Sequence, residues 1–181
     1  MPTCAVWRAE EAPLRVLYLV SVFLHLVAAA AWIGGMIALA AVVVPVLRRH
    51  QPRRDAMQLL HDSGLRLRSL GWAALGLLVL SGVVQAGYRS GGFAALASAA
   101  LWTSPWGQLL AAKLVLVGTI LCLAGVHDFR VGPQATRVSR EDPEAPAALR
   151  LRRRASWFGR VNLLLSLAVV ALGVLLARGF G

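Results

Sequence analysis

Acidic residues and lysine are scarce in this chain. Its 181 residues include 8 Asp and Glu against 19 Lys and Arg, and Lys113 is the single lysine. Every acidic residue falls in an expected loop, at a helix end, or in a helical extension beyond the apolar segments. An acid-driven, proton-coupled transporter of the usual kind needs a carboxylate at membrane depth, so the sequence argues against that class.

Cysteine and the common catalytic motifs are also scarce or missing. Cys4 and Cys122 have neither a CxxC nor a zinc-type Cys/His spacing. The nucleophile elbow, the P-loop, HExxH and the dinucleotide fingerprint do not occur. A non-enzymatic role is therefore favoured over an enzymatic one.

Long apolar segments are what the chain has instead. The first runs without a charge from Val16 to Leu47, and three shorter runs cover 70–88, 109–126 and 161–177. A membrane-spanning helix needs roughly 17–25 apolar residues. We therefore predict an all-α integral membrane protein, a four-helix bundle built as a single membrane domain over residues 1–181.

The turn and helix-end signals place the boundaries of these elements. Pro45 is expected to kink the end of the first helix. Thr103 or Ser104 is expected to cap the third helix, with Pro105 in its first turn. Residues 127–146 read as a mobile polar loop, and 149–160 as a basic segment lying along the membrane surface. The expected helices cover about 14–47, 56–88, 109–127 and 160–178, with a short interfacial helix at 93–101.

Positive charge is concentrated in two stretches between the apolar segments. Residues 48–69 hold six arginines and residues 128–160 hold eight. The positive-inside rule places both stretches in the cytoplasm and the N- and C-termini outside it. Arginines next to membrane spans favour the lipid bilayer as partner, with no nucleic acid expected.

His25 is an ionisable side chain within the first apolar segment. Such groups are costly in a membrane, which makes His25 a functional candidate. An imidazole can ligate a metal or haem iron, or relay a proton. The alternative, in which His25 only hydrogen-bonds a neighbouring helix, has equal weight. Met36 suits soft copper, but about 16 Å of helix rise separates it from His25, so the two cannot share one ion.

Other polar residues offer weaker candidates. Lys113 could meet an anionic cofactor group, although snorkelling to the outer interface is the simpler interpretation. Ser81 and Gln85 form an i,i+4 pair that could line a polar path or bond another helix. His61 and His127 fall on the cytoplasmic side, either as an inner metal or proton site or as independent surface residues.

Three segments of the chain resemble the membrane domain of the copper-resistance protein D (CopD) family. Two of them are VLSG at Val79–Gly82 and TSPWGQLLAAKLVL at Thr103–Leu116. The third is HLVAAAAWIGGMIALAAVVVPVLRR, in which the glycines also let another helix approach closely. The matching residues of that segment are His25, Trp32, Gly34, Gly35 and Pro45.

The CopD resemblance implies copper handling, in transport or resistance, by a multi-pass protein of a bacterial inner (plasma) membrane. Copper would be the bound ion and His25 its leading ligand. A periplasmic copper-binding protein and a homo-oligomer are the implied partners, because four helices alone leave little room for a path.

A second resemblance, to the HemJ-type protoporphyrinogen oxidase family, competes with the first. It rests on a histidine in the first helix followed by tryptophan and glycine, with a lysine in the third. It implies a haem-binding membrane redox protein or oxidase, with haem b, His25 as axial ligand and Lys113 as partner of a carboxylate. A structural or assembly subunit without a ligand is the third hypothesis.

Overall fold

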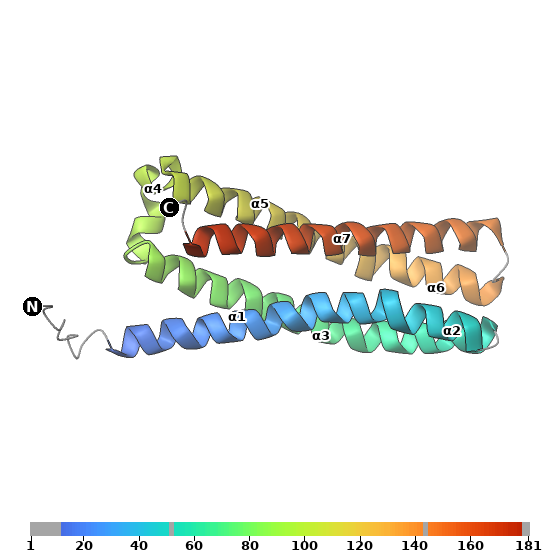
Figure 1. The fold of residues 1–181 in the computed structure, drawn as a ribbon. Helices are drawn as coiled ribbons and strands as arrows, with labels where there is room; N and C mark the ends of the chain where they lie inside the picture. Colours follow the sequence, from blue (N-terminus) through green and yellow to red (C-terminus); the bar gives the residue numbers. More distant parts are fainter. Residues whose placement is uncertain (1–11, 51–52, 143–144, 179–181) are drawn as a thin grey trace, which may run out of the picture.

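The computed structural model describes residues 12–50, 53–142 and 145–178, and all regular structure in these ranges is helical (Figure 1). Four helical stretches are long and apolar enough to cross a membrane, as predicted. The elements are α1 (Ala12–Ala38), η2 (Leu39–Val43), α2 (Val44–His50), α3 (Arg53–Arg89), η3 (Phe93–Ala97), α4 (Ala99–Thr103), α5 (Pro105–Val126), η4 (His127–Val131), α6 (Gly132–Glu141) and α7 (Pro146–Arg178).

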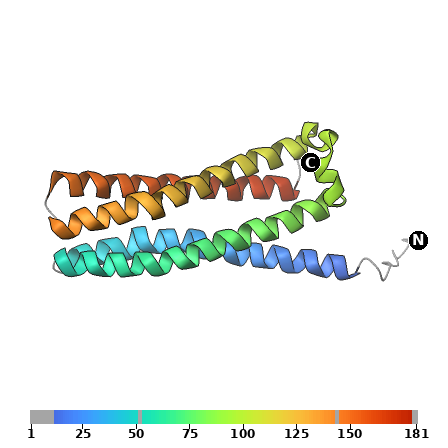
Figure 2. The same ribbon diagram turned by 180° about the vertical axis from the view of Figure 1, so that it is seen from behind.

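The bundle consists of two antiparallel hairpins. α1 and α2 pair with α3, and α5 and α6 pair with α7. Across the hairpins α1 contacts α7, and Leu75 of α3 forms a buried cluster with Ile120 and Ala124 of α5. η3 and α4 join the hairpins at the end where α1 begins and α7 finishes (Figures 1 and 2). The two Arg-rich connections lie together at the opposite end, which is the arrangement that the positive-inside rule requires.

The connection between the hairpins depends on glycine and on a serine cap. Gly91 and Gly92 have φ values of 83° and 127°, which other residues rarely adopt. The interfacial helix expected at 93–101 is two short helices, η3 and α4, separated at Ser98. Ser104 caps α5 by accepting from the Gly107 amide at 3.1 Å, which confirms the predicted cap, although the helix begins at Pro105, four residues before the expected 109.

The predictions for the Arg-rich segments are wrong. No mobile loop follows α5: the helix continues through the π-helical turn η4 and through α6 to Glu141. Likewise, the basic segment 149–160 is part of α7, which begins 14 residues before the expected 160. These extensions bury Val131, Ala135 and Ala148, so they pack on one another instead of lying flat on a membrane.

Both π-helical turns lie next to a proline. Pro133 is in the first turn of α6, directly after η4. Pro45 is the second residue of α2, directly after η2. A proline inside a helix lacks an N–H and its ring clashes with the carbonyl four residues earlier. At both prolines the chain stays helical through the π turn, and after η4 this replaces the loop that the sequence suggested.

Candidate polar sites in the membrane bundle

His25 points toward α3 and is hydrogen-bonded there. Its Nδ1 lies 2.8 Å from Oγ of Ser81, and Ser81 is buried. The Ser81 hydroxyl lies 2.5 Å from the Leu77 carbonyl oxygen and donates its proton to it. A hydroxyl has one proton, so Nδ1 must be the donor in the His25–Ser81 bond. The neutral imidazole then keeps an unprotonated Nε2, the nitrogen through which such a ring can bind a metal ion.

The surroundings of His25 are otherwise small and weakly polar. A side-chain carbon at Gly82 would be 3.6 Å from Cε1 of His25, so the ring lies close against the α3 backbone. One turn away, Gln85 Nε2 donates to the Ser21 carbonyl oxygen at 3.3 Å. Ser81 and Gln85, expected to act as a pair, therefore both bond α1.

Lys113 extends from α5 toward the end of α7. Its Nζ would be 3.6 Å from a side-chain carbon at Gly173, and it lies within electrostatic range of His25. In the described part of the chain, Lys113 has neither a carboxylate partner nor a hydrogen bond. Among the described residues, no carboxylate therefore offsets the Lys113 side chain near His25.

Met36 does not join this site. α1 is continuous from Ala12 to Ala38, so the 11 residues from His25 to Met36 correspond to about 16 Å of rise. Met36 instead lines a shallow hollow of about 70 Å³ between α1 and α3. The other lining residues are Ala31, Trp32, Gly35, Leu39, Leu67, Leu70 and Gly71.

Trp32 connects the two hairpins. Its Nε1 donates to Oγ of Ser166 in α7 at 3.0 Å, and Ser166 donates to the Asn162 carbonyl oxygen at 2.8 Å. The indole lies against Gly71, where a side-chain carbon would be only 2.8 Å from Cζ3 of Trp32. The close approach predicted beside Trp32 thus depends chiefly on Gly71. Gly35 contacts α3, whereas no atom lies within 4 Å of a side chain added at Gly34.

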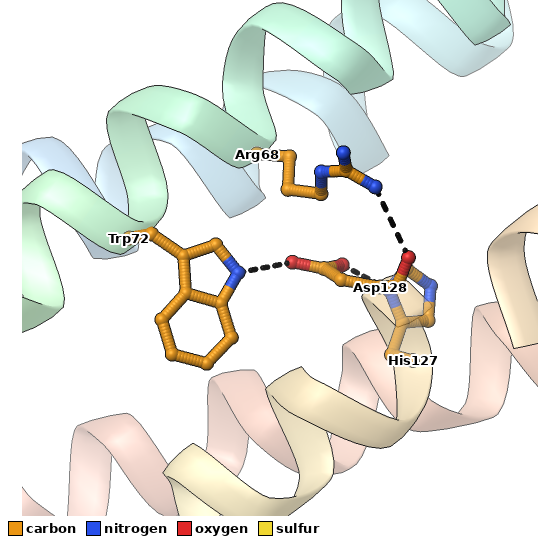
Figure 3. A network of polar contacts seen from close by, with 4 residues as sticks. All are labelled: Arg68, Trp72, His127 and Asp128. Carbon is orange, nitrogen blue, oxygen red and sulfur yellow. Dashed lines mark hydrogen bonds and ion pairs between the residues drawn. The ribbon is translucent and has the colours of Figure 1, made fainter. Parts of the chain in front are cut away.

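A second link between the hairpins surrounds Asp128 (Figure 3). Trp72 of α3 donates through Nε1 to Oδ2 of Asp128 at 3.0 Å, and His127 Nδ1 lies 2.8 Å from Oδ1. Arg68 donates to the Asp128 carbonyl oxygen at 3.3 Å and lies over the Phe129 ring. The sequence singled out His127 but missed Trp72 and Arg68, which lie 56 and 60 residues away from Asp128 along the chain.

The inner metal site suggested by His61 and His127 stays a prediction. The His61 side chain lies outside the part of the structure that is described, and His127 is engaged with Asp128. Among the described residues, no group of three or more His, Cys, Asp or Glu side chains could hold a metal ion.

With this geometry established, the comparisons identify the family. Residues 64–176 match the family model described as Copper resistance protein D. The chain belongs to this family. An uncharacterized protein of Aquifex aeolicus (strain VF5) is 31% identical over 160 residues, which cover 87% of this chain and 94% of that protein. No solved structure matches the chain.

The Copper resistance protein D match covers most of α3 and all of the second hairpin except its end. Ser81 and Lys113 lie inside the matched range. His25 and Trp32 precede the matched range, but both contact residues inside it. His25 is hydrogen-bonded to Ser81, and Trp32 donates to Ser166 and packs against Gly71.

Proposed function

We propose that this Copper resistance protein D family member binds copper ions as cargo and carries them into or across a bacterial inner membrane. His25 is the residue that meets the ion. The observation that supports this role is the chain of hydrogen bonds from His25 Nδ1 to Ser81 and from Ser81 to the Leu77 carbonyl. It fixes the imidazole in the form whose Nε2 can coordinate, and imidazole is a suitable ligand for copper.

The ligands present fit a transient site better than a storage site. Met36 is about 16 Å of helix rise away from His25, and the described residues form no group of three or more His, Cys, Asp or Glu side chains that could hold a metal ion. A positively charged Lys113 would also repel a bound copper ion. An ion at Nε2 therefore needs a further ligand from beyond the described residues. A periplasmic copper-binding protein or a second copy of the chain would supply it, and weak retention would let the ion move on.

The proposed orientation follows from charge. The Arg-rich end that holds α2 and α6 faces the cytoplasm, and the end that holds η3 and α4 faces outward. His25 and Ser81 then lie in the outer half of the bilayer, where copper would enter from outside.

Copper binding by the purified full chain tests the proposal. We expect detergent-solubilised protein to take Cu(I) from a chromogenic chelator, and His25→Ala to weaken this by at least about tenfold, since the ligand itself is lost. His127→Ala is the matched control and should bind copper as the wild type does. Equal copper affinity of His25→Ala and the wild type would overturn the assignment, as would unchanged copper tolerance of cells that lack the protein.

Haem binding is the second candidate, favoured by the unpaired Lys113 beside His25. A haem carboxylate would neutralise the lysine, and His25 would bind the iron. The hollow lined by Trp32 and Met36, however, does not include His25, and its volume of about 70 Å³ is far smaller than the roughly 300–1,000 Å³ of ordinary ligand pockets. A visible spectrum of protein expressed with ample haem separates the candidates: a Soret band that His25→Ala removes would favour haem over copper.

A further inference from the structure

The extension of α7 carries an arginine stripe that no part of the copper proposal uses. Arg150, Arg153, Trp157 and Arg160 follow one another at i, i+3, i+7 and i+10, which places them on one face of the helix. All four are exposed, and Trp157 has 59% of its surface accessible. We call these four residues the α7 stripe.

The described residues leave the charges of the α7 stripe without a partner. Among the described residues, none of its three guanidinium groups has an ion-pair partner. The neighbouring Arg154 differs, because it lies over the Phe158 ring at 6.0 Å. Phe158 in turn meets the edge of the Trp157 ring at 5.7 Å, which fixes the indole without covering it.

The depth of the stripe follows from the length of α7. Residues 161–177 carry no charge, and at 1.5 Å per residue they span about 26 Å, close to the thickness of a bilayer's hydrocarbon core. Arg160 then lies at the hydrocarbon boundary. Trp157 follows about 5 Å further out, within the headgroup layer. Arg153 follows about 10 Å further out, just beyond that layer, so its long side chain reaches back toward the headgroups.

We propose that the α7 stripe binds the phosphate of an anionic phospholipid headgroup, with Arg153 and Arg160 pairing with it and Trp157 packing on the glycerol region. Unpaired guanidinium groups match phosphate oxygens, and an indole at this depth combines an apolar face with a polar edge. The upright α7 holds these groups at fixed heights, whereas a basic segment lying flat on the membrane would attract negative charge without choosing a headgroup. This inference does not depend on copper binding.

Titration of the delipidated, detergent-solubilised full chain tests the proposal. Dioctanoyl phosphatidylglycerol should bind and shift Trp157 fluorescence to the blue, whereas dioctanoyl phosphatidylcholine and inorganic phosphate should bind far more weakly. Each arginine near a membrane surface contributes roughly fivefold in affinity, so Arg153→Gln with Arg160→Gln should weaken phosphatidylglycerol binding by about 25-fold. Trp157→Ala should abolish the fluorescence shift.

The matched control removes two arginines from the other end of the bundle. Arg89→Gln with Arg178→Gln changes net charge equally and should leave phosphatidylglycerol affinity within about twofold, because a distant charge contributes little beyond a Debye length. The proposal fails if both double variants lose affinity alike, or if the stripe variant binds as the wild type does. It also fails if inorganic phosphate binds as tightly as the lipid, or if a single-stranded RNA displaces the lipid. Thermal unfolding of each variant checks that the bundle is intact. If a double variant does not fold, the titration is repeated with its single substitutions.

Discussion

The indoles of Trp32 and Trp72, on the two helices of the first hairpin, each donate a hydrogen bond to the second hairpin. Trp32 of α1 donates to Ser166 of α7, and Trp72 of α3 donates to Asp128 of η4. In a bilayer, packing and hydrogen bonds replace the hydrophobic effect as the force between helices, so two such bonds matter for assembly. They make the contact between the hairpins specific, and most of the predictions below probe the groups that position His25 or hold this contact.

Removing the Ser81 hydroxyl should weaken copper binding without removing the ligand. In Ser81→Ala, His25 Nδ1 loses its acceptor, and the orientation and tautomer of the ring are no longer fixed. We expect Cu(I) affinity to fall by about tenfold, the lower end of the effect of residues that orient metal ligands. Chelator competition measures this, and Ser81→Thr, which keeps the hydroxyl, should restore affinity. Wild-type affinity in Ser81→Ala would show that this bond has no role in copper binding.

A methyl group at position 71 should destabilise the bundle. In Gly71→Ala the new carbon would lie 2.8 Å from the Trp32 ring, which its bond to Ser166 holds in place. We expect a cost of about 1–3 kcal/mol, measured by thermal or denaturant unfolding in detergent. Gly76→Ala in the same helix has nothing within 4 Å and should be neutral or slightly stabilising. Equal stability of the two variants would contradict the contact.

The Trp72–Asp128 bond should appear as coupling between two substitutions. Trp72→Phe removes the donor to a carboxylate and should cost about 2 kcal/mol of unfolding free energy. In an Asp128→Ala background the same substitution should cost much less, because the bond is already gone. Trp157→Phe is the control, since that indole is exposed and has no hydrogen-bond partner in the described structure. Additive costs in the double variant would mean that the indole and the carboxylate do not interact.

Chemical labelling should reveal the orientation of the bundle. In a variant whose native Cys4 and Cys122 are replaced, a cysteine at Ser90 lies at the η3 end and one at Gln58 lies at the Arg-rich end. A membrane-impermeant maleimide should label the Ser90→Cys variant in intact cells, and the Gln58→Cys variant only after permeabilisation. The opposite pattern would reverse the orientation proposed from the arginines.

Sequence reasoning succeeded where a property is local. Four apolar runs of bilayer length specify four spans, and Ser104 before Pro105 specifies the start of α5. It failed at Gly132 and Pro133, because these residues signal a loop unless a π turn and packing against α7 keep the helix continuous. Local patterns carry no information on that packing.

The candidate site shows the same division between local and distant information. Composition alone singles out His25, and an i,i+4 pattern singles out Ser81, but neither specifies that they bond to each other. The partners of Trp32 and Trp72 are 134 and 56 residues away in the chain. Such pairings depend on how the two hairpins rotate against each other, which a single sequence does not encode in any short motif.

Because α7 is one continuous helix, it also determines how far the protein extends beyond the membrane. About 14 residues of this helix precede Arg160, so its first turn stands about 20 Å above the hydrocarbon boundary. At the proposed cytoplasmic end, α7 is thus a helical extension and not a flexible loop. A molecule that docks at the tip is kept at a set height from the lipid, and its distance from the membrane is determined by helix geometry instead of by chain entropy.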